Sequence, residues 1–260
     1  MKHHLLYLLF IALLPTVIYG QVNTELLRNV NLEEGFTNTI AFDLGIMSGN
    51  SPMSSLKARY RSDFVKDDYS GFGVVSLQQG NQDGKRFLNN RFLHLRGIKD
   101  YSDTYSGELF IQSEYNQFTK LDDRRLLGIG LRRPYKNQSN KLKRYYGIGT
   151  MWESERLSTE ETTSVLRSTN YFTIYHQNSK YTVTSTSYFQ PNLSKLNDFR
   201  LVSDSRLGLN ISDQLSLVVN LSLRYDNDPP NGVEKFDMEL TNGFSFSFQT
   251  AAAPSPKNSS

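Results

Sequence analysis

The stretch QLSLVVNLSLRYD, residues 214–226, alternates between apolar and polar side chains along almost its whole length. The odd positions from Leu215 to Tyr225 are apolar or aromatic, and the even positions are polar except for Val218. Successive side chains of a β-strand point to opposite faces of the sheet. A period of two therefore predicts a strand with one apolar face and one polar, charged face.

The same alternation recurs through most of the chain, for example in residues 36–46, 56–64, 105–116 and 199–211. Turn sequences separate the runs, among them GNQDGK at 80–85 and NDPPNG at 227–232. An even number of strands would leave both chain ends on the same side, as in bacterial barrels. We expect about twelve strands (10–12), near residues 36–48, 54–66, 69–79, 86–98, 104–117, 124–134, 143–155, 165–177, 180–190, 197–212, 214–226 and 233–249.

Three features favour a transmembrane barrel over a soluble β-sandwich, whose half-buried strands would also alternate. The predicted strands are often twelve or more residues long, whereas strands of soluble proteins usually have about 5–6. Charged side chains such as Arg200 and Asp204 lie far inside a predicted strand. Tyr105 and Tyr115 share an apolar face at a spacing of about 25 Å along the barrel axis, close to the height of an outer-membrane apolar band. We therefore predict an all-β, antiparallel transmembrane β-barrel with its polar face toward the lumen.

Residues 1–20 predict a secretory signal peptide. Lys2 precedes an apolar run over residues 5–19, and Gly20 is a small residue at the expected cleavage point. The run is shorter than the roughly 20 residues that a membrane-spanning helix needs. We expect an exported chain in the bacterial outer membrane, with a polar lead-in at 21–35, a barrel at 36–249 and a disordered tail at 250–260.

The composition excludes several classes of function. The chain has no cysteine, which excludes disulfides, cysteine-ligated zinc, thiol catalysis and a lipidated N-terminal cysteine. The formal net charge of +3, from 29 basic and 26 acidic residues, is too balanced to indicate nucleic-acid binding. The mean hydropathy of -0.49 agrees with a barrel, because only one face of each strand would contact lipid.

The C-terminal stretch ELTNGFSFSFQ, residues 239–249, carries a second signal. A polar residue is followed two positions later by glycine and then by alternating aromatic residues. The pattern resembles the C-terminal insertion signal of bacterial outer-membrane barrels, in the positions Thr241, Gly243, Phe246 and Phe248. This resemblance implies outer-membrane lipid and the barrel assembly machinery as partners, and we expect a monomer.

The second half of the chain also resembles a known family. The segments YYGIGTMWESERL at 145–157, YFQPNLSKLNDFR at 188–200 and LSLRYDNDPPNGVEKFDMELTNGFSFSF at 221–248 carry the likeness. They are similar to domain-of-unknown-function family 481, the YdiY-like, salt-induced outer-membrane proteins. The resemblance implies an outer-membrane barrel, and the salt-induced label suggests an osmotic or envelope-stress role. The family has no settled activity that the resemblance could carry over to this chain, and we expect no cofactor.

The predicted lumen is the main candidate for a functional site. Opposite charges on neighbouring strands would pair across a narrow lumen and plug it, whereas stripes of one sign would line an ion-selective path. A purely structural role is a third alternative. The inward-facing candidates are Lys57, Arg59, Arg61, Glu108, Glu114, Arg200, Asp204, Arg206, Arg224, Asp226, Lys235, Asp237 and Glu239.

Two histidines, His94 and His176, lie outside the predicted signal peptide. His176 shares the outward parity of Phe172 and Ile174, and Ser179 follows it three residues later on the opposite parity. A serine–histidine pair needs hydrogen-bond reach and a third, orienting group, so we expect no catalytic residue here. His94 is expected to face the lumen beside Arg96.

We expect no metal site. The adjacent acids at 67–68 and 122–123 fit turns, and the acidic segment 153–163 is expected to be a loop that could at most attract calcium. Four glycines spaced two apart on one strand parity should leave room inside the barrel for bulky neighbouring side chains, namely Gly128, Gly130, Gly147 and Gly149.

The sequence leaves the function open. The favoured hypothesis is a non-enzymatic outer-membrane barrel with a narrow or occluded charged lumen, acting as a channel or a structural protein. The alternatives are an outer-membrane lipid-acting enzyme that uses His176 and a secreted soluble β-sandwich that binds a ligand.

Overall fold

The computed structural model describes residues 34–47, 53–82, 85–117, 120–135, 141–158, 161–229 and 234–250. The predicted signal peptide, most of the predicted lead-in and residues 251–260 of the predicted tail lie outside this part of the chain. Within the described residues, no helix is long and apolar enough to cross a membrane.

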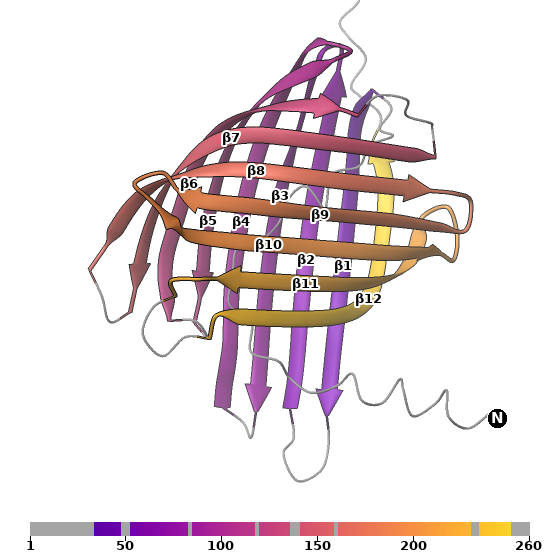
Figure 1. Cartoon of the computed structure of the whole chain (residues 1–260). Helices are drawn as coiled ribbons and strands as arrows, with labels where there is room; N and C mark the ends of the chain where they lie inside the picture. The colour runs from indigo at the N-terminus through magenta and orange to yellow at the C-terminus, as the bar shows by residue number, and fades with distance from the viewer. Residues whose placement is uncertain are drawn as a thin grey trace, which may run out of the picture.

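Twelve antiparallel strands form one closed barrel (Figure 1). Each strand pairs with its neighbours in sequence, and β1 closes the barrel by pairing with β12. The closure confirms the barrel and shows that the sandwich alternative is wrong. The strands are β1 (Gly35–Met47), β2 (Met53–Lys66), β3 (Tyr69–Gln82), β4 (Lys85–Ser102), β5 (Tyr105–Asn116), β6 (Leu121–Pro134), β7 (Leu142–Leu157), β8 (Thr163–Gln177), β9 (Tyr181–Asn192), β10 (Lys195–Asn210), β11 (Leu215–Asp226) and β12 (Phe236–Thr250).

The strand bounds agree with the prediction to within two residues at most ends and differ by more at a few. β4 continues to Ser102 because its backbone still pairs with β5, Asp100 opposite Ser106 and Ser102 opposite Tyr105. The acids at 122–123 lie inside β6 rather than in a turn, whereas Asp67 and Asp68 do form the turn between β2 and β3.

The two faces of each strand differ in the predicted sense. In β5 the side chains of Glu108, Phe110 and Gln112 are buried inside the barrel, while Leu109 is 54% exposed on the outside. The outer surface of the barrel therefore carries a continuous series of apolar side chains, which suits contact with lipid. Examples from strands around the barrel are Leu44, Leu77, Leu95, Ile111, Ile129, Ile148, Leu166, Leu201 and Leu240.

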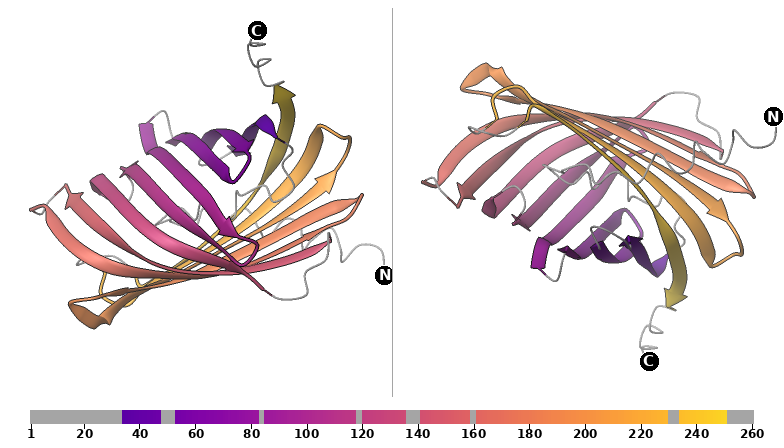
Figure 2. Two further views of the ribbon diagram at one scale, coloured as in Figure 1. Left: turned by 90° about the horizontal axis from the view of Figure 1, so that it is seen from above. Right: turned by 90° about the horizontal axis from the view of Figure 1, so that it is seen from below.

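The barrel is flattened rather than round. In Figure 1 the strands β1–β4 run upright, and β8–β11 cross them steeply on the opposite wall. Figure 2 shows the two walls facing each other along the long direction of the barrel mouth. This shape brings side chains from strands that are not neighbours within reach across the lumen.

Glycine at position 243 allows the barrel to close at the junction of β1 and β12. A Cβ atom at Gly243 would lie 2.0 Å from the Asp43 Oδ1 atom and 2.5 Å from the Phe42 carbonyl oxygen. The pairing of these two strands runs only from Phe36 opposite Thr250 to Phe42 opposite Phe244. The glycine therefore sits where β12 leaves β1, and it has a local packing role besides its place in the insertion-signal pattern.

Candidate functional site in the lumen

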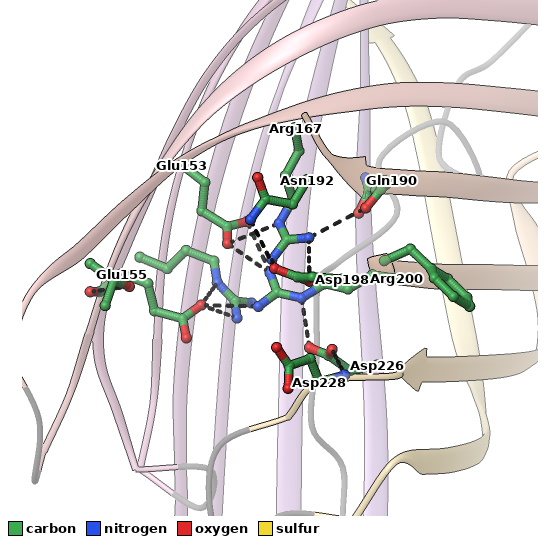
Figure 3. Close-up of polar contacts among 12 residues, drawn as sticks. Glu153, Glu155, Arg167, Gln190, Asn192, Asp198, Arg200, Asp226 and Asp228 are labelled. Atoms are coloured by element: carbon green, nitrogen blue, oxygen red, sulfur yellow. Dashed lines mark hydrogen bonds and ion pairs between the residues drawn. The ribbon is translucent and has the colours of Figure 1, made fainter. Parts of the chain in front are cut away.

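An acidic side chain on β7 joins arginines from two other strands inside the barrel. The Glu153 side chain is 3% exposed, and its Oε1 and Oε2 atoms accept hydrogen bonds from Arg200 Nη1 on β10, at 2.8 and 3.0 Å. The Arg167 Nε atom on β8 lies 3.5 Å from the same carboxylate. Figure 3 shows these three side chains meeting in the lumen. Two strands separate β7 from β10, so the contact with Arg200 spans part of the lumen.

Both arginines have a second acidic partner. Arg167 Nη1 donates to Asp198 Oδ1 at 2.9 Å, and Asn192 Nδ2 donates to the other oxygen of Asp198 at 2.9 Å. Arg200 Nε donates to Asp226 Oδ2 on β11 at 2.7 Å (Figure 3). Each charge in this part of the lumen is therefore neutralised by a charge of opposite sign.

The same set of ion pairs continues toward β5 and β6. Arg124 Nε on β6 donates to Glu155 Oε2 on β7 at 2.8 Å, and Arg124 Nη1 lies 3.5 Å from Glu114 Oε2 on β5. We call this set the ionic network: Glu114, Arg124, Glu153, Glu155, Arg167, Asp198, Arg200 and Asp226. All eight residues lie toward the end of the barrel opposite to the one where β1 begins and β12 ends.

A second layer of side chains fills the middle of the lumen. Tyr171 on β8 donates a hydrogen bond to Glu108 Oε2 on β5 at 2.9 Å, and two strands separate these partners. The His94 ring is 1% exposed and stacks between Phe72 and Phe110, with ring centroids 5.6 Å apart in both cases. The prediction that His94 faces the lumen is confirmed, and its role here is packing.

Two glycines make room for this layer, as predicted from their spacing. A Cβ atom at Gly128 would lie 2.2 Å from the Phe110 ring, and one at Gly147 would lie 2.1 Å from the Tyr171 ring. Gly130 and Gly149 face each other across β6 and β7, where a Cβ at Gly149 would meet the Ile129 carbonyl oxygen at 2.3 Å.

At the end of the barrel where β1 begins and β12 ends, the lumen opens into two cavities. One has a volume of about 690 Å³ and is lined by Arg59, Arg61 and Arg206 together with hydroxyl side chains. The other, of about 530 Å³, is lined by the β2–β3 and β4–β5 turns and by Arg132. Asp63 lines both cavities, so they adjoin each other.

Most of the predicted lumen residues do face inward, and several are paired. Arg224 Nη2 lies 2.9 Å from Asp204 Oδ1, and Lys57 Nζ lies 3.7 Å from Glu239 Oε1. Asp237 is buried. Lys235 is a correction: it is exposed and precedes β12, which begins at Phe236 and not at residue 233.

The sequence prediction missed the centre of the ionic network. Glu153 and Glu155 stand at the end of the strand predicted at 143–155, but they were also assigned to an acidic loop at 153–163 and not to the lumen; they lie in β7 and point inward. Arg124, Arg167 and Asp198 were not singled out at all. A usable signal was present, because Met151, Glu153 and Glu155 share one parity and Trp152 lies on the other.

The structure does not bring the candidate histidine and serine together. His176 faces outward, with its ring centroid 5.6 Å from that of Tyr181, whereas Ser179 lines the cavity that contains Arg206. Within the described part of the chain, no hydrogen bond joins the two residues. The described residues also contain no cluster of acids and histidines that could hold a metal ion.

The insertion-signal residues divide between the two faces of β12. Gly243 is buried toward the lumen side, and Phe246 is 43% exposed on the outside with its ring centroid 6.0 Å from that of Phe248. An outward aromatic pair at the end of the last strand is compatible with recognition by assembly machinery, which stays a prediction.

Comparisons with known proteins agree with this architecture. The family model described as "Protein of unknown function, DUF481" matches residues 40–248. No curated protein matches the chain in sequence. Among solved structures, the NanC porin is similar with a TM-score of 0.50 and 7% identity, over 81% of this chain and 98% of that one. A KdgM porin in complex with disordered oligogalacturonate has a TM-score of 0.49 and 11% identity, over 81% and 99%. At these identities the likeness shows the fold alone, which is that of outer-membrane porin barrels.

Proposed function

We propose that this chain, which belongs to the DUF481 family of proteins of unknown function, is a non-enzymatic outer-membrane barrel whose lumen is occluded by its own side chains. The apolar outer surface and the fold of outer-membrane porins support the location. The predicted export signal and insertion signal belong to the same proposal. In this hypothesis the lumen is closed by side chains, whereas the lumen of a general porin is an open channel.

The observation that carries the proposal is the position of Glu153 between Arg167 and Arg200. These ion pairs are buried, and the one with Arg200 joins β7 to β10, which are not adjacent in the sheet. Removing one partner from a buried ion pair leaves an uncompensated charge and typically costs about 3–5 kcal/mol. A solute that had to separate these charges would meet a barrier of similar size, so the network acts as a plug.

The aromatic layer beneath the network supports the same conclusion. Tyr171 reaches Glu108 across the lumen, and the rings of Phe72, His94 and Phe110 fill the space beside them. Two successive layers of different chemistry would both have to move before a hydrated solute could pass. If these layers move, they could open a narrow passage for small ions, and the protein would then act as a channel.

The positions of the described histidines support a non-enzymatic role. These histidines are His94, packed between aromatic rings, and His176, which faces outward away from Ser179. A serine–histidine mechanism needs the serine within hydrogen-bond reach of the histidine, and Ser179 does not meet this condition for His176. The envelope-stress role rests on the family resemblance alone, and growth of a deletion strain at high salt would test it separately.

Conductance in planar bilayers tests the proposal directly. The mature chain would be refolded into detergent, checked for a heat-modifiable shift on a gel, and reconstituted at matched protein-to-lipid ratios. Three proteins would be compared: the unaltered chain, the triple variant Glu153→Ala, Arg200→Ala, Tyr171→Ala, and the control Arg125→Ala. Arg125 forms an exposed ion pair with Asp123 and lies outside the lumen.

The unaltered chain and the Arg125 control should show no sustained porin-like conductance, and the triple variant should conduct. A large, steady conductance of the unaltered chain would overturn the occlusion. A folded triple variant that stays closed would show that the ionic network and Tyr171 are not what closes the lumen, and this would also overturn the proposal.

A further inference from the structure

The cavity of about 690 Å³, at the end of the barrel where β1 begins, has an unusual charge distribution. It is lined by residues of β1, β2 and β8–β12, together with the β8–β9 and β10–β11 turns. Arg59 and Arg61 enter it from β2, and Arg206 enters it from β10 on the opposite wall. We call it the arginine cavity.

The three arginines differ in how their charges are balanced. Arg61 Nε donates to Asp63 Oδ2 at 2.7 Å, so its charge has an adjacent carboxylate. Arg59 and Arg206 form no hydrogen bond or ion pair with any residue that the structure describes. Arg206 instead lies close enough to Arg59 and Arg61 for mutual repulsion.

Asp43 is the acidic group whose charge acts on both of these arginines. It attracts Arg59, Lys57 and Arg206, and it is repelled by Glu239. Its carboxylate lies over Gly243, outside the lining of the cavity. Lys57 and Glu239 form an ion pair with each other. The cavity lining also contains Asp213, which is exposed in the β10–β11 turn and forms no ion pair with a described residue. Asp43 therefore has to balance two guanidinium groups. About one positive charge is left, for which the lining offers only the solvent-exposed carboxylate of Asp213, because Asp63 is already bound to Arg61.

This arrangement contrasts with the ionic network at the other end of the lumen. There, every arginine has a carboxylate within 3.5 Å. An uncompensated charge in a partly buried site is expensive, and an unsatisfied polar group in a folded protein commonly marks the place of an ion or ligand. We infer that the missing counterion in the arginine cavity is supplied by a ligand.

We propose that the arginine cavity binds a phosphate-type oxyanion carried on a small polar molecule. Arginine holds such groups through paired, charge-assisted hydrogen bonds from its planar guanidinium. The volume is in the range of pockets that hold small organic ligands, and is larger than a bare phosphate needs. The lining offers hydroxyl groups to the rest of the molecule, from Thr39, Thr182, Thr184, Ser216, Ser245 and Ser247.

The inference goes beyond the proposed function, because an anion could bind here whether or not the lumen conducts. The same chemistry fits two sources, a free phosphorylated solute or the headgroup of an anionic phospholipid reaching in from the membrane. The cavity lies at the end of the barrel where β1 begins and β12 ends, so either source would enter from that side.

Isothermal titration of the refolded mature chain tests the site. The protein would be kept in a non-ionic detergent and a zwitterionic buffer of low salt, because other anions would compete for the arginines. Inorganic phosphate and glucose 6-phosphate would be titrated, with glucose as the neutral control. In a separate arm, phosphatidylglycerol would be added in mixed micelles, with phosphatidylcholine as its neutral control.

The variants would be Arg206→Gln, Arg59→Gln and Arg206→Lys, with Arg133→Gln as the matched control. Arg133 lies toward the same end of the barrel but is exposed on the outer face of β6. A heat-modifiable gel shift would establish that each variant is folded before it is titrated.

Glucose 6-phosphate should bind and glucose should not, and each Arg→Gln variant should weaken binding by at least about tenfold. Arg206→Lys should retain part of the affinity, and the Arg133 control should keep all of it. Binding of phosphatidylglycerol alone, lost in Arg206→Gln, would support the site with a lipid headgroup as its ligand. Absence of binding in both arms, or binding that is unchanged in folded Arg206→Gln and Arg59→Gln, would overturn the proposal.

Discussion

Substitution of Glu153 by glutamine should destabilise the barrel by an amount that can be derived from its contacts. The change Glu153→Gln keeps the size of the side chain and removes one negative charge. Two hydrogen bonds from Arg200 and the ion contact with Arg167 lose their charge–charge component. Because all three groups lie inside the barrel, water cannot fully replace the lost interaction.

The remaining contacts set the size of the effect. Breaking a buried ion pair by removing one partner typically costs about 3–5 kcal/mol. Arg167 keeps Asp198 and Arg200 keeps Asp226, so neither guanidinium is left without a carboxylate. We therefore expect the lower end of this range, about 3 kcal/mol, which corresponds to a change of more than a hundredfold in the unfolding equilibrium.

Urea unfolding in lipid vesicles would measure this change through the single tryptophan of the chain. Trp152 lies beside Glu153 on β7 and is 44% exposed on the outer face, so its fluorescence should change when the strand leaves the lipid. The free energy of unfolding would be extrapolated from the denaturant dependence, with unchanged slope as the test of comparable end states.

An exposed ion pair provides the control. Asp123→Asn removes the partner of Arg125, at 3.0 Å on the barrel surface, and should change the free energy of unfolding by less than about 1 kcal/mol. If folded Glu153→Gln were as stable as the Asp123 variant, the ionic network would contribute nothing, and the argument for a plug would fail.

Three further substitutions test other parts of the structure. Gly128→Ala should impair refolding, measured by the heat-modifiable gel shift, because the new methyl group overlaps the Phe110 ring; adding Phe110→Ala should restore the shift. Arg206→Met should raise resistance to urea, since it removes a charge repelled by Arg59, and a lowered unfolding midpoint would contradict the cavity electrostatics. His176→Ala should leave lipid hydrolysis assays unchanged from the unaltered chain, and loss of a measured activity would revive the enzyme alternative.

The fold was predictable because strand periodicity is a local property. Alternation in each run identifies the face of every side chain, and in a closed barrel the inside and the outside are the only two faces. His94 could be placed in the lumen on this basis alone, as could the glycines at 128 and 147. The strand ends were less predictable, since the end of β4 is set by pairing with β5 and not by polarity.

The partners of the lumen charges were not predictable from parity. Parity indicates that Glu153 points inward once it is placed in a strand, but its partner Arg200 lies on β10, two strands beyond the nearest neighbour. That contact depends on how far the barrel is flattened, which is a property of the whole sheet. The acidic composition around residues 153–161 favoured a loop because polar runs at strand ends resemble turns.

At one end of the lumen the arginines carry excess positive charge, and at the other end every arginine is paired with a carboxylate. Anion binding and ion conduction can therefore be separate properties. An anion that enters at the end where β1 begins and β12 ends meets Arg59 and Arg206, whose charges are balanced by Asp43 and, more weakly, by the exposed Asp213. To go further it would have to pass the aromatic layer and then separate Arg200 from Glu153, at the cost of a buried ion pair. Binding in the arginine cavity can therefore be strong while passage is blocked. The opposite outcome is that the unaltered protein conducts and that Arg206→Gln abolishes both conduction and anion binding. The cavity would then be one binding site along a continuous path for anions, and the ionic network would have to open in the unaltered protein.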